Sequence, residues 1–433
     1  MSSIVKHNYL ESLLKSLPQK PIDNLSWLKQ LRTDAIDSVG KQKLPTLRDE
    51  DWRFTDISPL TKLPYQPSKA ICNLQISDID HLFLEEKNNR LVFVDGHYAP
   101  QLSNIIDDEG LVIGNISELI ATQAPNIEPH LGQYAKFEDS IFTAQNTAFL
   151  QDGAFISVAH NTSVSSPVHL LFLATQEEVT SYTRCLLIGD AGSNVTLIED
   201  FVSLQEAAYV TNAVTEISLA ANAQAKHYRV QRENNNAFHL ANCSVSLAHT
   251  SRYQSANISL GAHISRINLN VHLTDEAAEC SIDGLTLISG RQLSDTHTTI
   301  DHLKPNGTSH QQHKCIIDDE AHAVFNGKIM VRPQAQRTNS SQSSRNLLLS
   351  GQSHIDTKPQ LEIFADDVKC AHGATVGQLD NEELFYLQSR GLSEAEARNL
   401  LTYAFGAEII NRIPITSLRQ QLEHMVLNQT QSC

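Results

Sequence analysis

Strand signals without a helical stripe run through the whole middle of the chain, from about residue 141 to residue 377. The segment 266–273, R-I-N-L-N-V-H-L, alternates strictly, so its four aliphatic side chains share one face. The segment 242–247, N-C-S-V-S-L, repeats this alternation with Cys243 as a small apolar side chain on the inward face. Because no crossover helices separate the strands, the pattern excludes a βαβ architecture.

Short clusters of small and polar residues separate these strands. The clusters read D-A-G-S-N, A-A-N-A-Q-A, T-D-E-A-A, P-N-G-T-S and D-D-E-A-H. They recur about every 20–25 residues with one wider gap, a spacing that indicates the coils of a repeating stack. A β-sandwich is an alternative, but a β-helix, in which each coil stacks on the last, fits the pattern better.

Both ends of the chain have helical character. Apolar residues at helical spacing are Leu10, Leu13, Leu14 and Leu17, followed by Leu28, Leu31, Ala35 and Val39. Near the C-terminus, Asp380 and Ser393 are expected N-caps of two helices, each with a glutamate three positions on, and Gly391 is expected to end the first helix. Some of the apolar surface of these short helices is expected to dock on the β unit or on another chain.

The predicted fold is therefore mainly β with α-helical ends. We expect an N-terminal helical region over residues 1–85 and a mixed α/β connecting segment over 86–140. A parallel β-helix core is expected over 141–377, and a C-terminal helical domain over 378–433.

Composition narrows the classes of partner. The 433 residues carry a net charge of −16, which argues against nucleic acid or an anionic membrane surface as the main partner. No apolar run approaches the roughly 18 residues that a membrane span needs. Lys6, Glu11 and Lys15 interrupt any signal-peptide core, and the seven cysteines form no C-x-x-C pair. These features predict a cytoplasmic protein with reduced thiols.

The stretch K-C-A-H-G-A-T-V-G, residues 369–377, places a thiol and an imidazole two positions apart. In a strand, Cys370 and His372 share one face, about 6–7 Å apart along the chain. They could supply two ligands to a metal ion, or be an ordinary packed pair; the spacing alone leaves both readings open. Five further histidines crowd into the segment 297–322, and we interpret these as outward polar positions and turns. They are His297, His302, His310, His313 and His322.

Several longer motifs resemble a known family. They are R-N-L-L-L-S, K-P-Q-L-E-I, D-D-V-K-C-A-H-G-A-T-V-G and L-F-Y-L-Q-S-R-G-L-S between residues 345 and 393, and L-P-T-L-R-D-E-D-W-R-F-T at 44–55. Together they are similar to the SufB/SufD family of SUF iron–sulfur cluster assembly proteins, over nearly the whole chain. The resemblance implies an N-terminal helical region, a right-handed parallel β-helix and a C-terminal helical domain.

Three positions point to the SufD branch rather than the SufB branch. SufB-like chains carry a cysteine where this chain has Ser344, a glutamate where it has Gly373, and often a cysteine where it has Leu387. A role as an independent cluster scaffold is therefore not expected.

The resemblance implies partners and site residues. The expected complex contains SufB, which meets this chain through the β-helix, and the SufC ATPase, held by the C-terminal helices. His372 falls on the family's functional histidine and Cys370 on the nearby cysteine, where transient iron or a nascent cluster would lie between subunits. We expect the imidazole of His372 to point out of the coils toward that neighbour. The expected SufC-docking residues are Phe385, Tyr386, Arg390, Leu400 and Phe405.

Two alternatives stand beside this interpretation. A β-helix carbohydrate-active enzyme would use clustered acidic residues such as 318–320, although that run is expected to cap a turn. A metal-free homodimeric platform is the other, and a homodimer is also expected when the chain is alone. The sequence contains no G-x-x-x-x-G-K-(S/T) motif, so we expect no nucleotide to be bound by this chain, and flavin binding is left open.

Overall fold

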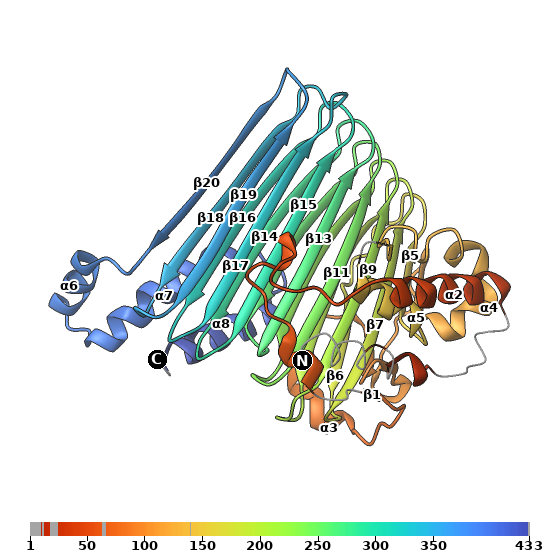
Figure 1. Ribbon diagram of the computed structural model, residues 1–433, viewed down its shortest axis with the longest axis horizontal. Coiled ribbons are helices and arrows are strands. Elements are labelled where there is room, and N and C mark those ends of the chain that lie inside the picture. The colour runs from red at the N-terminus through yellow and green to blue at the C-terminus, as the bar shows by residue number, and fades with distance from the viewer. Residues whose placement is uncertain (1–9, 11–12, 18–24, 63–65, 139, 432–433) are drawn as a thin grey trace.

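The computed structural model describes residues 10, 13–17, 25–62, 66–138 and 140–431. Two parallel β-sheets lie against each other along most of the molecule, with helices at both chain ends (Figure 1). From β5 to β20 each coil contributes one strand to each sheet, because the odd-numbered strands follow one another in one sheet and the even-numbered strands in the other. The predicted parallel β-helix core with helical ends is confirmed.

The first sheet, sheet A, runs from β4 to β19. Its strands are β4 (Leu111–Asn115), β5 (Ala154–Val158), β7 (Val179–Gly189), β9 (Val210–Leu219), β11 (Phe238–Leu247), β13 (Ile264–Leu273), β15 (Leu293–His302), β17 (His322–Val331) and β19 (His354–Ile363), with β1 (Gln66–Pro67) beside β7.

The second sheet, sheet B, runs from β3 to β20. Its strands are β3 (His97–Tyr98), β2 (Asn89–Val94), β6 (Val168–Ala174), β8 (Asn194–Ser203), β10 (Gln224–Arg232), β12 (Arg252–Ser259), β14 (Glu279–Ile288), β16 (Thr308–Ile317), β18 (Asn339–Leu348) and β20 (Lys369–Gly377). Strands β2 and β4, from the expected connecting segment 86–140, thus belong to the sheets themselves.

One coil takes up more of the chain than the spacing of the small-residue clusters predicted. The spacing in sequence between paired residues of consecutive coils gives the length of a coil. Between β5 and β20 this spacing is shortest where Phe238 pairs with Ile264 and longest where His322 pairs with His354. The sequence-based estimate is wrong because it combined two different corners of the coil. The clusters at 190–194 and 220–225 turn from sheet A to sheet B, whereas the cluster at 318–322 turns from sheet B back to sheet A.

Small residues at the corners have a specific steric cause. Gly192 has φ of +72°, and a Cβ there would lie 2.2 Å from Oδ1 of Asn161 in the preceding coil. Asn222 adopts a φ of +60° at the equivalent corner of the next coil, a conformation that asparagine tolerates better than most residues.

The coil interior combines apolar and polar side chains along the stack. Leu197, Ile217, Val245 and Leu269 belong to one continuous buried cluster in the earlier coils. Hydrogen-bonded polar side chains lie inside as well, both in an earlier coil, where Nε2 of His227 lies 2.9 Å from Oε2 of Glu199, and in later coils. Gln342 donates from Nε2 to Oε1 of Gln311 at 2.8 Å, and Gln311 in turn bonds to the hydroxyl of Thr298.

Two histidines of the 297–322 group lie inside these coils. His302 and His313 expose 0% and 3% of their surface, so the expectation of outward positions is wrong for both. Their Nε2 atoms lie 2.9 Å from the hydroxyl of Ser309 and 3.2 Å from that of Thr286, respectively. Burial lowers the pKa of each imidazole to about 4, and these hydrogen bonds let the neutral rings remain inside.

The N-terminal elements lie mainly along the outer faces of the earlier coils. They are α2 (Ser26–Lys41), η2 (Glu50–Trp52), η3 (Ser58–Lys62), α3 (Ile76–Ile79), η4 (Asp80–Leu82), η5 (Pro100–Leu102), α4 (Ile116–Ile127) and α5 (Ile141–Ala148). The predicted stripe in α2 is confirmed, since Leu28, Ala35 and Val39 are buried. Lys6 and Glu11, used above in the signal-peptide argument, lie outside the described residues.

The C-terminal helices are α6 (Asn381–Ser389), α7 (Glu394–Ile410) and α8 (Thr416–Gln431). The predicted caps are present: Asp380 accepts from the N–H of Glu382, Ser393 and Glu396 form a capping box, and Gly391 adopts a φ of +101° after α6.

Helices α7 and α8 differ from α6 in what they cover. Ile410 of α7 and Leu422 of α8 belong to the same buried cluster as Tyr228 and Ile316 on the outer face of sheet B. The apolar surface of these two helices therefore docks on the β unit. Figure 1 shows α6 set apart from the sheets, beyond the end of β20.

Candidate functional site

The last strand of sheet B carries the predicted thiol and imidazole. Strand β20 pairs in parallel with β18, so Cys370 lies beside Ser340 and His372 beside Gln342. Ser340 and Gln342 expose 2% and 3% of their surface and point into the coil. By this register Cys370 and His372 lie on one face, as predicted, and that face is the interior face of the last coil.

The expected outward direction of His372 is therefore wrong. His372 faces inward because of the register in which β20 pairs with β18 of the previous coil, and the local sequence pattern does not reveal that register. His372 is nevertheless exposed and Cys370 half-buried, because no strand of the described chain follows β20 in sheet B. The imidazole thus lies at the open mouth of the coil.

The other strand at this mouth, β19, also leaves interior positions uncovered. Ile363 is registered with Val331, which is fully buried one coil earlier, yet Ile363 itself is 39% exposed. Val376 on β20 is 51% exposed, and Phe364 at the corner between the two strands is 58% exposed. An unpaired strand edge beside uncovered apolar residues is a surface suited to a second polypeptide.

Cys370 and His372 supply two ligands, fewer than a complete metal site needs. Partial burial raises the pKa of the Cys370 thiol, and a backbone hydrogen bond with Ser340 offsets part of that effect. A thiolate here is therefore favoured by a bound cation rather than by the chain alone. Ser344, at the SufB-type cysteine position, is buried and accepts from the hydroxyl of Thr357 at 3.2 Å, and open space surrounds Gly373.

The expected docking residues fall into two groups. Phe385 and Tyr386 on α6 are 73% and 57% exposed, and the guanidinium of Arg390 lies 5.2 Å from the centre of the Tyr386 ring. Leu400 of α7, 45% exposed, joins Tyr386 in a groove of about 370 Å³ between the two helices.

Phe405 belongs to an internal contact instead. The ammonium group of Lys314 on β16 lies 4.5 Å from the centre of the Phe405 ring and donates to its carbonyl oxygen at 2.9 Å. Lys314 also forms an ion pair with Glu408, in which Nζ lies 2.5 Å from Oε2. The side chain of Phe405 thus helps to hold α7 on sheet B.

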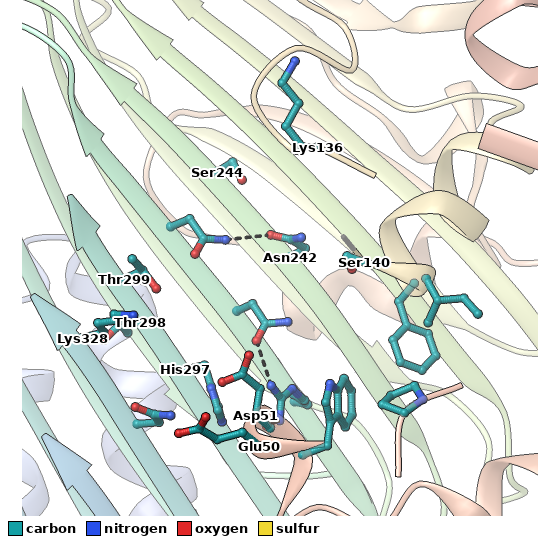
Figure 2. A pocket seen from close by; sticks show the side chains of 18 of the residues that line it. Glu50, Asp51, Lys136, Ser140, Asn242, Ser244, His297, Thr298, Thr299 and Lys328 are labelled. Atoms are coloured by element: carbon teal, nitrogen blue, oxygen red, sulfur yellow. Dashed lines mark hydrogen bonds between the residues drawn. The ribbon is translucent and has the colours of Figure 1, made fainter. Parts of the chain in front are cut away.

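A larger polar cavity of about 760 Å³ lies on the outer face of sheet A. Figure 2 shows side chains of the sheet, among them Asn242, His297 and Lys328, facing the N-terminal segment that carries Glu50 and Asp51. This is the surface where the alternative enzymatic interpretation would place a substrate.

The buried carboxylate at this surface contacts three side chains. Asp295 forms an ion pair with Arg266, accepts from the hydroxyl of Thr55 at 2.5 Å and lies 3.0 Å from Nε2 of His297. Burial alone would raise the pKa of Asp295, but the charges of Arg266 and His297 lower it to about 2. The cluster ties the N-terminal segment to sheet A, and sequence reasoning missed it because its members come from three distant segments.

The acidic run at 318–320 lies at a corner, where it was expected. Asp318 accepts from the N–H of Asp319, and Asp319 accepts from the N–H of Gly290 at 2.9 Å. Glu320 pairs with Arg291 at 3.0 Å. These carboxylates stabilise turns and do not line the cavity of sheet A.

The fold and site define a class: a parallel β-helix protein whose last coil is uncovered and carries a thiol and an imidazole at its mouth. Residues 172–405 match the family model described as "SUF system FeS cluster assembly, SufBD core domain", and residues 15–170 match the SufBD protein N-terminal region. The chain belongs to the SufBD family of SUF iron–sulfur cluster assembly proteins, as its motifs indicated.

Individual relatives agree with this assignment. An iron–sulfur cluster assembly SufBD family protein of Synechocystis sp. is 39% identical over 417 residues, covering 94% of this chain and 92% of the relative. The iron–sulfur cluster assembly protein SufD of Escherichia coli is 33% identical over 391 residues, 89% of each chain. SufD of Bacillus subtilis is 25% identical over 427 residues, 96% of this chain and 97% of the relative.

In the part of the chain that the structure describes, no helix is both long and apolar enough to span a bilayer. The cytoplasmic location stays a prediction.

Proposed function

We propose that this chain is a non-catalytic subunit of the SUF assembly machinery that pairs with SufB through the open end of its β-helix. In this proposal His372, with Cys370 beside it, contributes to the junction where nascent clusters form, and so takes part in iron acquisition. The single observation that carries the proposal is the position of both side chains at an uncovered, partly apolar coil mouth.

The exposed apolar side chains at the coil mouth favour contact with a protein partner over contact with solvent. Ile363, Phe364 and Val376 together leave a substantial apolar surface open beside the free edges of β19 and β20. A docking β-helix would cover these side chains and satisfy the edge, since stacked repeats need a cap at each end. SufB is the proposed occupant, and a second copy of this chain takes its place when SufB is absent.

The ligand chemistry supports a shared site. Iron accepts thiolate and imidazole, and cysteine thiolates are the usual ligands of iron–sulfur clusters. With two ligands on this side, the partner must supply the others. A cluster held in this divided way can be passed on, because separating the two sides removes half of its ligands.

The SufC-binding surface is proposed to be the groove between α6 and α7. Its apolar lining includes Tyr386 and Leu400, and Phe385 stands exposed on the adjacent face of α6. Deleting residues 393–433 would also remove the packing of Ile410 and Leu422 from sheet B, so point substitutions on α6 test the docking surface more cleanly.

Glu50, Asp51 and Glu362 line the cavity of sheet A, and Asp295 is buried at the same surface. All but Asp51 pair with a cation, which supports a non-catalytic role. Asp295 is held by Arg266, Glu50 pairs with Lys358 at 2.8 Å, and Glu362 pairs with Lys328 at 2.6 Å. A glycosidase-type mechanism needs one free acid and one free base.

The test replaces His372 by alanine in the complex assembled with SufB and SufC. We expect the His372→Ala complex to form with normal stoichiometry and to lose most of its iron–sulfur cluster, measured by iron content and visible absorption. His310→Ala is the matched control, because His310 is an exposed histidine of the same sheet, bonded to Ser341 on the outer face. Normal cluster content in the His372→Ala complex would reject the assignment.

A further inference from the structure

Three metal-ligating side chains gather on the outer face of sheet A, near the starts of β17 and β19. His322 begins β17, His354 begins β19, and the two residues are registered partners in the parallel pair. Asp356 is two positions after His354 and so projects from the same face. The neighbouring residue Ala323 is fully buried inside the coil, which confirms that His322 points outward.

Both imidazoles converge on one carboxylate oxygen. Nε2 of His322 lies 2.8 Å from Oδ2 of Asp356, and Nε2 of His354 lies 3.2 Å from the same oxygen. One ligand atom from each of the three residues lies within 4.8 Å of the others. Ligand atoms about 2.0–2.1 Å from one ion, at angles between 90° and the tetrahedral value, lie roughly 2.9–3.4 Å apart, so small rotations suffice to enclose an ion.

We infer that His322, His354 and Asp356 bind a first-row divalent transition metal ion, with coordination positions left open to solvent. Two imidazoles and one carboxylate are a ligand set used by catalytic zinc and by non-haem iron(II). The ligands are held by two paired strands, which fixes their spacing better than a loop would. Access is direct, because the side chain of His354 is 65% exposed, and those of His322 and Asp356 are 26% and 24% exposed.

This site is separate from the one proposed for cluster assembly. Cys370 and His372 lie on sheet B near the corner at 364–368, whereas His354 follows the corner at 349–353, at the other end of β19. The metal site goes beyond the proposed function and does not depend on it. Because His354 and Asp356 lie on the last strand of sheet A, the open coordination positions of the metal ion stay accessible beside the free edge of β19.

The test titrates the full chain, purified without a histidine tag, with Co²⁺ and with Zn²⁺ in competition with a chromophoric chelator. The background for all measurements carries Cys370→Ser and His372→Ala, so that the coil mouth does not contribute. We expect one Co²⁺ per chain with a visible d–d spectrum, and the same equivalent taken by Zn²⁺. An anaerobic Fe²⁺ competition against Co²⁺ extends the comparison to iron.

Three variants and one control decide the outcome. His322→Ala, His354→Ala and Asp356→Asn are each expected to weaken binding at least about 10-fold, because losing a ligand should cost at least as much as losing a residue that only hydrogen-bonds to a ligand. His310→Ala is expected to leave the affinity and the spectrum unchanged. Thermal melting without metal confirms that each variant is folded. Equal metal affinity in the background protein and in His354→Ala and Asp356→Asn would overturn the site and assign the binding to scattered surface histidines.

Discussion

Replacing Val376 by aspartate should block docking at the coil mouth without unfolding the chain. Val376 lies on the interior face of β20 and keeps 51% of its surface exposed. Complete burial of an aliphatic side chain contributes about 1.5–3 kcal/mol, so covering the exposed half contributes about 0.8–1.5 kcal/mol to docking.

Aspartate removes this contribution and adds a charge that docking would have to desolvate. Together the two effects should weaken binding by at least about 2 kcal/mol, or roughly 30-fold in Kd. The free chain should change little, because the site is half-exposed on a terminal strand, and substitutions at such positions usually stay within about 0.5 kcal/mol.

The assay measures the Kd of purified SufB for the wild-type chain and the variant by calorimetry, with urea unfolding of each chain alone. Ile71→Asp is the matched control, since Ile71 is 52% exposed but lies in the N-terminal segment. If Val376→Asp is folded and binds SufB within twofold of wild type, the coil mouth is not the docking surface.

Three further predictions test other parts of the account. Glu216→Gln should lower the free energy of unfolding by about 3–5 kcal/mol in urea titrations, because it leaves Arg184 buried without its ion-pair partner. Lowering the pH from 7 to 5 should destabilise the chain by roughly 2 kcal/mol through His313 alone: its pKa is about 4 when folded and about 6.5 when unfolded, so the unfolded chain binds more protons in this window. His313→Gln should flatten that pH profile, and an unchanged profile would contradict the buried neutral ring. Phe385→Ala with Tyr386→Ala should reduce SufC recovery at least about tenfold in pull-downs without shifting the melting temperature, whereas unchanged recovery would reject the α6 surface.

The periodic parts of the fold could be predicted from local sequence. The alternation at 266–273 falls within β13, and the capping box of Ser393 and Glu396 begins α7, because both features depend on residues only a few positions apart. The coil length could not be obtained in this way. It depends on two corners of different geometry, which short clusters of small residues do not distinguish.

The candidate sites, too, could be predicted from local sequence only in part. That Cys370 and His372 share a face follows from their spacing, but which face it is depends on the pairing of His372 with Gln342 in the previous coil. His322 and His354 likewise lie a full coil apart in sequence, and their proximity becomes visible only through the register of β17 and β19. Contacts of this kind depend on how the coils stack, so no local sequence pattern predicts them.

The most direct test of the account is a crystal structure of this chain bound to SufB and soaked with iron or a heavier thiophilic metal, with the ion located by anomalous scattering. We expect an ion about 2.0–2.3 Å from a ring nitrogen of His372 or from the Cys370 sulfur, with its remaining ligands supplied by SufB. A SufB molecule seated elsewhere, with the coil mouth open and no metal beside His372, would contradict it.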